Sequence, residues 1–459
     1  MAISGSMAKA RRRTPTRAER VALGKALRRK VSRSSHAAWT PARDRTDPVS
    51  LLEESSRGRV ARLLPIRFGR MAHSPFAYLR GAASVMAHDL ASTPVTGLRV
   101  QLAGDAHVGN FGVFGTPERD RVFDVNDFDE TLPGPWEWDL KRLATSLVVA
   151  GRSDGLLRPE NRRAALAAVR SYRDAMAVFA SQRYLDTWYF HLDRASIAKA
   201  LTRRGREVAG RALSQARLRT AFRAFPRMVR TTPGGLRIRE EPPLIVHYAN
   251  HADAEESRTF YHRYLQTLPD ERRLILERYQ VTDVAQKVVG VGSVGTVCSI
   301  VLLTADRDPA DPVFLQLKQA LPSALEPYLG RSRYASHGER VVVGQHLIQE
   351  ASDIFLGWSQ LGSRDFYVRQ LRDMKFASDI ATFGPKALVG QGELCGAALA
   401  RAHARTGDPS AISGYLGNRD LLDEAIADFA ESYADQTERD HAALVRAIRR
   451  GRLPSEPDL

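Results

Sequence analysis

One glycine-rich segment constrains the fold of this chain more than any other. Gly290, Gly292 and Gly295 form a G-x-G-x-x-G pattern, which in a dinucleotide-binding α/β fold connects a strand to a helix. Here the flanking segments VAQKVV and VCSIVLL are both rich in β-branched residues, so the loop connects one strand to another. The pattern therefore predicts a hairpin in an antiparallel sheet and argues against a Rossmann-type site.

Helical sequence surrounds this predicted hairpin on both sides. Two short strands, GLRVQLAG and RVFDVNDFD, precede a long run of helical sequence, and helical sequence returns over the last 85 residues. Further strands (VFLQLKQA, DIFLGW and DFYVRQL) and a helix over 336–350 follow the hairpin. We expect an α+β fold with a helix-rich lobe and a small antiparallel sheet lobe. We expect four segments: a basic arm over residues 1–45, the helix-rich lobe over 46–275, the sheet lobe over 276–375, and C-terminal helices over 376–459 that return to the helix-rich lobe.

The positive charge of the chain is unevenly distributed. The sequence has 68 Lys and Arg against 52 Asp and Glu, a balance that suits nucleic-acid binding. However, residues 1–70 alone hold 18 basic and 5 acidic residues, so the rest of the chain is nearly neutral. We interpret residues 1–45 as a mobile basic arm with one short helix. Nucleic-acid binding through this arm is the less favoured alternative.

Cysteine content and hydropathy bear on where the protein resides. Two cysteines, Cys298 and Cys395, are too few for a disulfide framework or a cysteine-rich zinc site. The sequence also lacks a run of about 18 apolar residues, the length that a membrane span needs. We expect a cytoplasmic protein with no membrane-spanning segment.

Polar residues cluster at the ends of the two early strands. The segment GDAHVGNFG places Asp105 and Asn110 five residues apart, and FDVNDFDET places Asp127 and Asp129 at the next strand end. Phosphoryl transfer needs a carboxylate to accept the hydroxyl proton and oxygen ligands for Mg²⁺. We predict Asp105 as the base and Asn110, Asp127 and Asp129 as metal ligands. Two alternatives remain: ordinary turn residues, or a metal-dependent hydrolase that uses His107 with the aspartates.

These motifs resemble those of the protein-kinase-like superfamily. GDAHVGN, NDFDE and GPWEWDLKRLA are similar, in this order, to the catalytic half of aminoglycoside and choline kinases. The resemblance implies a two-lobed fold that binds ATP and Mg²⁺, and it makes Asp139 a structural residue at a helix start. The sequence departs from the pattern at Ala103, where those kinases carry a histidine.

The glycine-rich loop and a lysine provide the second half of this resemblance. In kinases such a strand–loop–strand covers the ATP phosphates, so Gly290, Gly292, Ser293 and Gly295 are candidate phosphate contacts and Val297 an adenine contact. A hairpin without a ligand is the alternative. The chain has 59 Arg and only 9 Lys, yet a lysine, Lys318, ends the third strand, where a compact ammonium suits a phosphate contact.

An acidic residue on the following helix is expected to hold this lysine. Glu339 lies 21 residues after Lys318 and is predicted as its partner and as part of the catalytic set, with Glu350 and Glu326 as alternatives.

The order of the motifs differs from that of ordinary kinases. Asp105 precedes Gly290 by nearly 190 residues, whereas kinases place the glycine-rich loop first. The chain therefore resembles a circular permutation of that fold. It also resembles, over about residues 20–450, a bacterial family named domain of unknown function 2252, through segments such as GVGSVGT, LEPYLG and YVRQLRDMK.

Together these features predict a class of reaction. We expect an ATP- and Mg²⁺-dependent phosphotransferase acting on a hydroxyl of a small-molecule acceptor. An AMP-transferring enzyme and a non-catalytic nucleotide-binding protein of the same fold are the alternatives.

Overall fold

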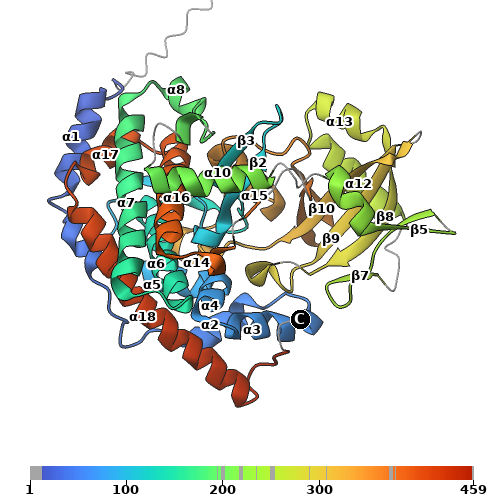
Figure 1. Cartoon of the computed structure of the whole chain (residues 1–459), viewed down its shortest axis with the longest axis horizontal. Helices are drawn as coiled ribbons and strands as arrows, with labels where there is room; N and C mark the ends of the chain where they lie inside the picture. The colour runs from blue at the N-terminus through green and yellow to red at the C-terminus, as the bar shows by residue number, and fades with distance from the viewer. Residues whose placement is uncertain are drawn as a thin grey trace, which may run out of the picture.

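The computed structural model shows a helical part and a sheet part side by side (Figure 1). It describes residues 13–456 apart from 194, 198–201, 217–220, 234, 249–253, 289, 306–307, 372–375 and 378. The α+β class with a small antiparallel sheet, expected from the sequence, is confirmed.

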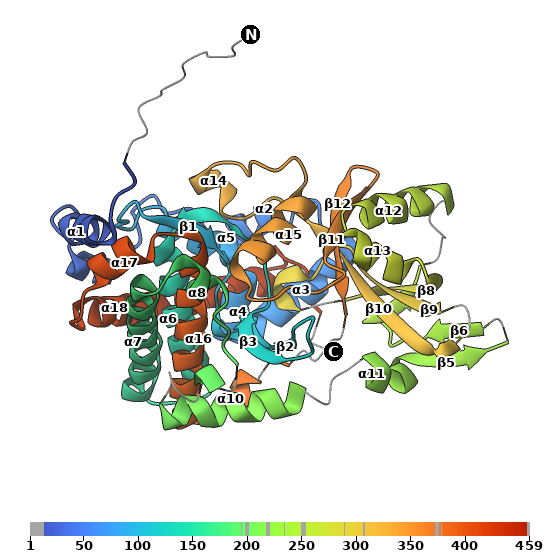
Figure 2. The same cartoon turned by 90° about the horizontal axis from the view of Figure 1, so that it is seen from above.

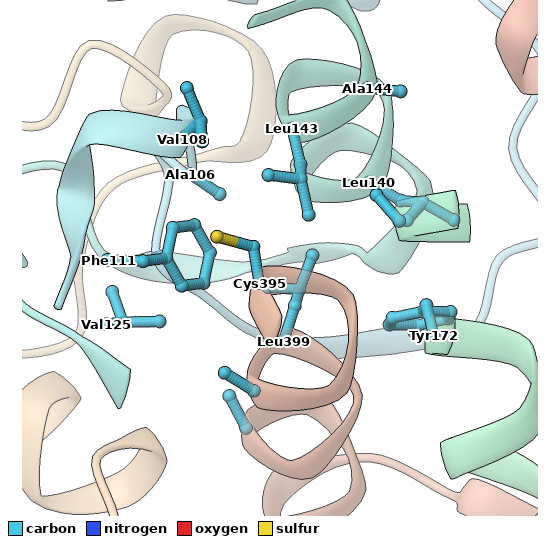
Figure 3. Close-up of a cluster of buried hydrophobic side chains, with 14 of the residues drawn as sticks. Ala106, Val108, Phe111, Val125, Leu140, Leu143, Ala144, Tyr172, Cys395 and Leu399 are labelled. Carbon is cyan, nitrogen blue, oxygen red and sulfur yellow. The ribbon is translucent and has the colours of Figure 1, made fainter. Parts of the chain in front are cut away.

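Four long helices form the centre of the helical part. They are α6 (Trp136–Ser153), α7 (Arg158–Ser181), α16 (Pro385–Thr406) and α18 (Leu421–Arg449). Helices α6 and α16 are buried along almost their whole length, and charged side chains such as Asp139 and Arg142 of α6 and Arg401 of α16 are buried with the apolar ones. Leu143 of α6, Cys395 and Leu399 of α16 and Phe111 approach one another in this core (Figure 3).

Shorter helices surround this centre. They are α1 (Arg17–Leu27), α2 (Pro48–Ser55), α3 (Leu64–Ala72), α4 (Pro75–Gly81), α5 (Ala83–Leu90), α8 (Tyr184–Trp188), α10 (Arg203–Ala216), α14 (Glu326–Leu329) and α17 (Pro409–Leu416). Figure 2 shows α1 beside α17 at the end of the molecule farthest from the sheet.

The described part of the basic N-terminal segment packs on the helical part. Arg28 donates from Nε to the Tyr415 carbonyl (2.9 Å), and Arg33 donates to the Leu416 carbonyl (2.8 Å). Arg45 forms ion pairs with Asp89 (2.7 Å) and Asp440 (2.6 Å). The expectation of a mobile arm therefore does not describe residues 13–45, whose arginines bind carbonyls and carboxylates of the same chain. The short helix expected there is α1.

Two small antiparallel pairs lie between α5 and α6. Strand β1 (Arg99–Leu102) pairs with β4 (Leu132–Pro135), and β2 (Phe111–Gly115) pairs with β3 (Arg121–Val125). The β2–β3 ladder continues one residue beyond the strands, because Asn126 N donates to the Asn110 carbonyl at 2.9 Å. The end of the β1–β2 loop and the start of the β3–β4 loop therefore lie side by side.

The larger sheet is antiparallel throughout, in the order β11-β12-β10-β9-β8-β7. Its strands are β7 (Ile245–His247), β8 (Tyr279–Lys287), β9 (Cys298–Ala305), β10 (Asp308–Ala320), β11 (Gly357–Leu361) and β12 (Arg364–Gln370). Alternate residues of β9 face opposite sides. Val301 and Leu303 pack with α12 (Ala254–Gln266) and α13 (Asp270–Leu276). Ile300 and Leu302 pack with the hairpin described next.

The described residues between 226 and 258 contain regular structure. After α11 (Ala221–Met228), β5 (Val229–Thr232) and β6 (Gly235–Ile238) form a hairpin, and β7 adds an edge strand to the sheet. Burial of apolar residues such as Ile238 under the sheet stabilises these short strands.

Helix α15 (His337–Ile348) joins the two parts. Its Val341, Val342 and Ile348 belong to the same cluster of buried side chains as Leu102 and Phe111 of the early strands. The helical part and the inner edge of the sheet part therefore share one continuous hydrophobic core.

Candidate functional site

A polar cavity of about 450 Å³ lies where the early loops meet the sheet. Its walls come from α3, α4, the β1–β2 and β3–β4 loops, the β8–β9 loop and strands β10 and β12. The predicted site residues that line it are Asp105, Asn110, Asp127, Gly290, Gly292, Ser293 and Lys318. Residues nearly 190 positions apart in the sequence thus share one cavity.

Buried polar contacts fix the loop that carries Asp105. The carboxylate of Asp139, at the start of α6, accepts from Ala103 N (2.7 Å) and Gly104 N (3.0 Å). His403 of α16 lies 3.3 Å from the same carboxylate. Gly104 has a φ of +82°, and a Cβ there would lie 2.3 Å from the Glu130 carbonyl, so only glycine fits this turn.

Asp105 is hydrogen-bonded through only one of its own two carboxylate oxygens. Arg142 Nε donates to Oδ1 at 2.5 Å, while Oδ2 lies 3.8 Å from His107 Nε2. Burial raises the pKa of Asp105, and Arg142 offsets this rise only in part. Burial and the nearby arginines hold the pKa of His107 well below its usual range, so its ring is neutral. Oδ2 therefore remains the oxygen that can accept a proton.

Asn110 and Asp127 present oxygen atoms to the same cavity. Asn110 donates from Nδ2 to the Asp105 carbonyl (2.9 Å), which leaves its Oδ1 available. Asp127 keeps 33% of its side chain exposed, and its Oδ1 lies 3.8 Å from Lys318 Nζ. Burial and the neighbouring charge of Asp129 raise the pKa of Asp127.

Asp129 holds Lys318 in place. Lys318 Nζ donates to its Oδ2 at 2.8 Å, Ser293 Oγ donates to the same oxygen at 3.0 Å, and Tyr367 Oη donates to Oδ1 at 2.7 Å. Burial opposes ionisation of Asp129, but Lys318 and these hydrogen bonds outweigh it and lower the pKa of Asp129 to about 2. The two carboxylates likewise outweigh burial and raise the pKa of Lys318.

Glu339 does not take part in this ion pair. Among the described residues, the carboxylates within 4.0 Å of Lys318 Nζ are those of Asp127 and Asp129. The alternatives are engaged elsewhere: Glu350 lies 3.8 Å from Arg401, and Glu326 lies 3.9 Å from His337.

Helix α15 contacts the site through Arg340, the residue that follows Glu339. The buried Arg340 donates to the carbonyls of Thr131, Asp129 and Leu321, each at 2.8 Å. The helix therefore positions the backbone of Asp129, and the ion pairs of Lys318 are made by the two carboxylates of the β3–β4 loop.

Two arginines from the helical part hold the glycine-rich loop. Arg59 donates to the carbonyls of Gly292 (3.0 Å) and Val294 (2.7 Å), and Arg67 donates to Val291 (3.2 Å) and Gly292 (2.9 Å). The arginines hold the loop through its carbonyl groups. Gly290, Gly292 and Ser293 of the held loop line the cavity.

Gly295 and Val297, also predicted contacts, do not line the cavity as described. Gly295 has a φ of +90° and serves the turn back into β9. Val297 packs with the cluster under α12 and α13, beside Leu317, on the sheet face opposite Lys318. The Arg372 and Lys375 positions near the end of β12 lie outside the described residues.

Several site residues were not predicted from the sequence. Arg142 follows Asp139 by three positions and so shares its helix face, a spacing that could have identified it. Tyr367 and Arg369 alternate on β12 opposite Lys318 and Gln316. Arg369 donates to Gln316 Oε1 (3.1 Å) and the Asn126 carbonyl (3.3 Å). His403 has no signal in the sequence, because only the fold brings α16 to this loop.

The oxygen atoms of Asp127 and Asn110 suit a hard cation that takes its remaining ligands from outside the protein. Among the described residues, no group of three or more His, Cys, Asp and Glu could hold a metal ion. Asp127 and Asn110 offer two oxygens, whereas both oxygens of Asp129 already accept hydrogen bonds. Mg²⁺ commonly binds one or two carboxylates and completes its shell with water and phosphate, so these two residues fit that ion.

The comparison with protein families identifies the chain. Residues 59–447 match the sequence profile of a family described as uncharacterized proteins conserved in bacteria (DUF2252). The chain belongs to the DUF2252 family. Searches of curated proteins and of solved structures gave no match to this DUF2252 protein. No helix in the described ranges of this DUF2252 protein has the length and apolar character to cross a membrane.

Proposed function

We propose that this protein is an ATP- and Mg²⁺-dependent phosphotransferase that acts on a hydroxyl group of a small-molecule acceptor. One observation carries the proposal: a proton-accepting carboxylate, two metal-suited oxygens, a buried lysine and a glycine-rich loop line the same cavity. Phosphoryl transfer requires positioning and charge neutralisation more than covalent chemistry, and these are the parts it needs.

Each residue has a definite role in this proposal. Lys318 donates to the nucleotide phosphates while Asp129, itself hydrogen-bonded by Tyr367, holds the ammonium group in place. Asp105 accepts the proton of the acceptor hydroxyl through Oδ2, the oxygen that Arg142 leaves available. Asp127 and Asn110 would hold Mg²⁺, which when bound neutralises phosphate charge.

The resemblance to kinases gains support from how the loop is held. Ala103 stands where aminoglycoside-type kinases carry a histidine. In this chain His403 lies 3.3 Å from the Asp139 carboxylate that binds the loop backbone, and so supplies an imidazole from another helix. A kinase-like fold in permuted order is therefore part of the proposal.

Calorimetric titration with Mg·ATP tests the proposal. We expect Asp127→Asn to weaken Mg·ATP binding by about tenfold or more, because it removes the charged metal ligand. The matched control Asp44→Asn changes an exposed carboxylate that does not line the cavity and should bind like wild type.

Product analysis then identifies the reaction. In a metabolite screen for ATP consumption, phosphate on the acceptor hydroxyl supports phosphoryl transfer, whereas AMP on the acceptor contradicts it and indicates nucleotidyl transfer. Nucleotide binding that is equal in wild type and Asp127→Asn would count against the metal role of Asp127.

A further inference from the structure

Arg80 occupies an unusual place in the wall of the site cavity. It lies in the last turn of α4 and lines both the 450 Å³ cavity and a small chamber of about 50 Å³ behind the glycine-rich loop. The two spaces also share Asp105, Asp127, Gly292 and Ser293, so Arg80 stands where they join.

The guanidinium of Arg80 lacks a hydrogen-bond acceptor. Across the described part of the chain it makes no hydrogen bond and no ion pair within 4.0 Å, and its Nε is buried without an acceptor. The charges of Asp105 and Asp127 act on it from farther away, and each of these carboxylates is closer to another cation: Asp105 to Arg142, and Asp127 to Lys318 at 3.8 Å. Leaving a largely buried cation without an acceptor is costly, so such a group indicates a binding partner from outside the chain.

The position of Arg80 is well determined by its surroundings. Ser74 caps α4, and the Cζ atom of Arg80 lies 5.9 Å from the centre of the Phe76 ring. Arg67 donates to the carbonyl of the next residue, Gly81, at 2.9 Å. These contacts fix the α4 backbone at Arg80 and place its side chain against the Phe76 ring on the cavity wall.

Arg80 lies on the side of the cavity formed by the Asp105 loop. A Cβ at Gly109 would be 3.8 Å from Arg80 Nε and 3.2 Å from the His107 ring, so the guanidinium lies beside that loop. Lys318, which the proposed function assigns to the nucleotide, donates to Asp129 of the β3–β4 loop and lies 5.3 Å from the ring centre of Tyr367 on β12. The two cations thus have different supporting elements.

We infer that Arg80 binds an anionic group of the acceptor, so that the acceptor is a hydroxyl compound carrying a phosphate or a carboxylate. The inference rests on the proposed function, because it assigns the Asp105 side of the cavity to the acceptor. A planar guanidinium matches the paired oxygens of either anion, and its place beside Asp105 would anchor the molecule near the proton acceptor.

Titration with small anions tests this inference. Wild type is saturated with Mg²⁺ and a non-hydrolysable ATP analogue, and is then titrated with inorganic phosphate, malonate or uncharged glycerol. We expect binding of at least one anion and not of glycerol. Arg80→Gln should weaken that binding by about tenfold or more while the affinity for the analogue stays within about twofold.

Two further variants separate charge from structure. Arg80→Lys keeps the positive charge but loses the paired N–H donors of the guanidinium, and should bind the anion with intermediate affinity. Arg57→Gln changes an exposed arginine and should match wild type. Thermal unfolding verifies that each variant is folded.

Three results would overturn the inference. They are no anion binding to wild type, equal binding to Arg80→Gln, or a loss in Arg80→Gln of affinity for the ATP analogue but not for ADP. The last result would assign Arg80 to the transferred phosphate. If wild type binds no nucleotide, the proposed function fails, and the same anion titration on nucleotide-free protein still tests Arg80.

Discussion

Single residues of the site have structural contacts beside the chemical roles proposed for them, and the Lys318–Asp129 pair shows this most clearly. Lys318 is 3% exposed and its shortest ion pair is with Asp129, so a change at either residue removes the closest opposite charge of the other. A loss of activity after one substitution would therefore not distinguish a phosphate contact from a folding defect.

A double substitution makes that distinction. Lys318→Met should lower the free energy of unfolding by about 3 kcal/mol, because Asp129 loses its partner. Adding Asp129→Asn should recover much of that stability but none of the nucleotide affinity. Urea unfolding and calorimetry measure the two quantities. Recovery of nucleotide binding in the double variant would show that Lys318 acts only in folding.

The pH dependence of the free energy of unfolding below pH 4 tests the role of the Asp129 carboxylate. The pKa of Asp129 is lowered from 3.8 to about 2, so its charge stabilises the fold above pH 4 and this contribution is lost as the pH falls toward 2. Wild type should therefore lose about 2 kcal/mol more than Asp129→Asn between pH 4 and pH 2. Parallel pH curves for the two proteins would contradict this assignment.

At the scale of elements, the sequence predicted strands and helices better than it predicted contacts between them. Strand–loop–strand at the glycines and a helix near 336–350 follow from local periodicity, and the structure has β8, β9 and α15 there. The partner of Lys318 could not be found in this way. Glu339 and Arg340 are adjacent on α15, and only the packing of the helix decides which one faces the site.

The same limit applies to His403 and Tyr367. Each reaches the site from a helix or strand that lies far along the chain from the loop it contacts. Asp105, Asn110 and Asp127 were predictable as a group because Asp105 and Asn110 share one short loop, and the β2–β3 hairpin brings the chain back from Asn110 to Asp127.

Helix α15 offers a matched pair of neighbouring substitutions. Arg340→Gln removes donors from three buried carbonyls and should destabilise the protein by about 2 to 4 kcal/mol. Glu339→Gln should change both stability and Mg·ATP affinity little, because Glu339 does not contact Lys318. A large loss of nucleotide affinity in Glu339→Gln would mean that the helix rotates when nucleotide binds.

For the whole molecule, the N-terminal segment belongs to the folded body. Besides its arginine contacts, His36 Nε2 lies 2.7 Å from the Tyr415 hydroxyl in the interior. Arg45 connects Asp89 of α5 to Asp440 of α18, which joins both ends of the chain.

Truncation tests this integration. Removing residues 1–45 should lower stability by several kcal/mol relative to a chain that begins at residue 13, because Asp89 and Asp440 lose Arg45 in the interior. Denaturant unfolding of both truncated proteins measures the difference. Equal stability of the two would mean that residues 13–45 only lie on the surface.

The contact of α16 with the early loops has a consequence for synthesis of the protein. The Asp105 loop is translated in the first quarter of the chain, yet the imidazole beside Asp139 and the arginine that pairs with Asp124 come from residues 401–403. Domains usually fold as they leave the ribosome. Here a nascent chain carries the Asp105 loop and its direct partners Asp139 and Arg142 long before His403 exists. A prematurely released fragment would therefore contain the loop without the imidazole that lies against Asp139.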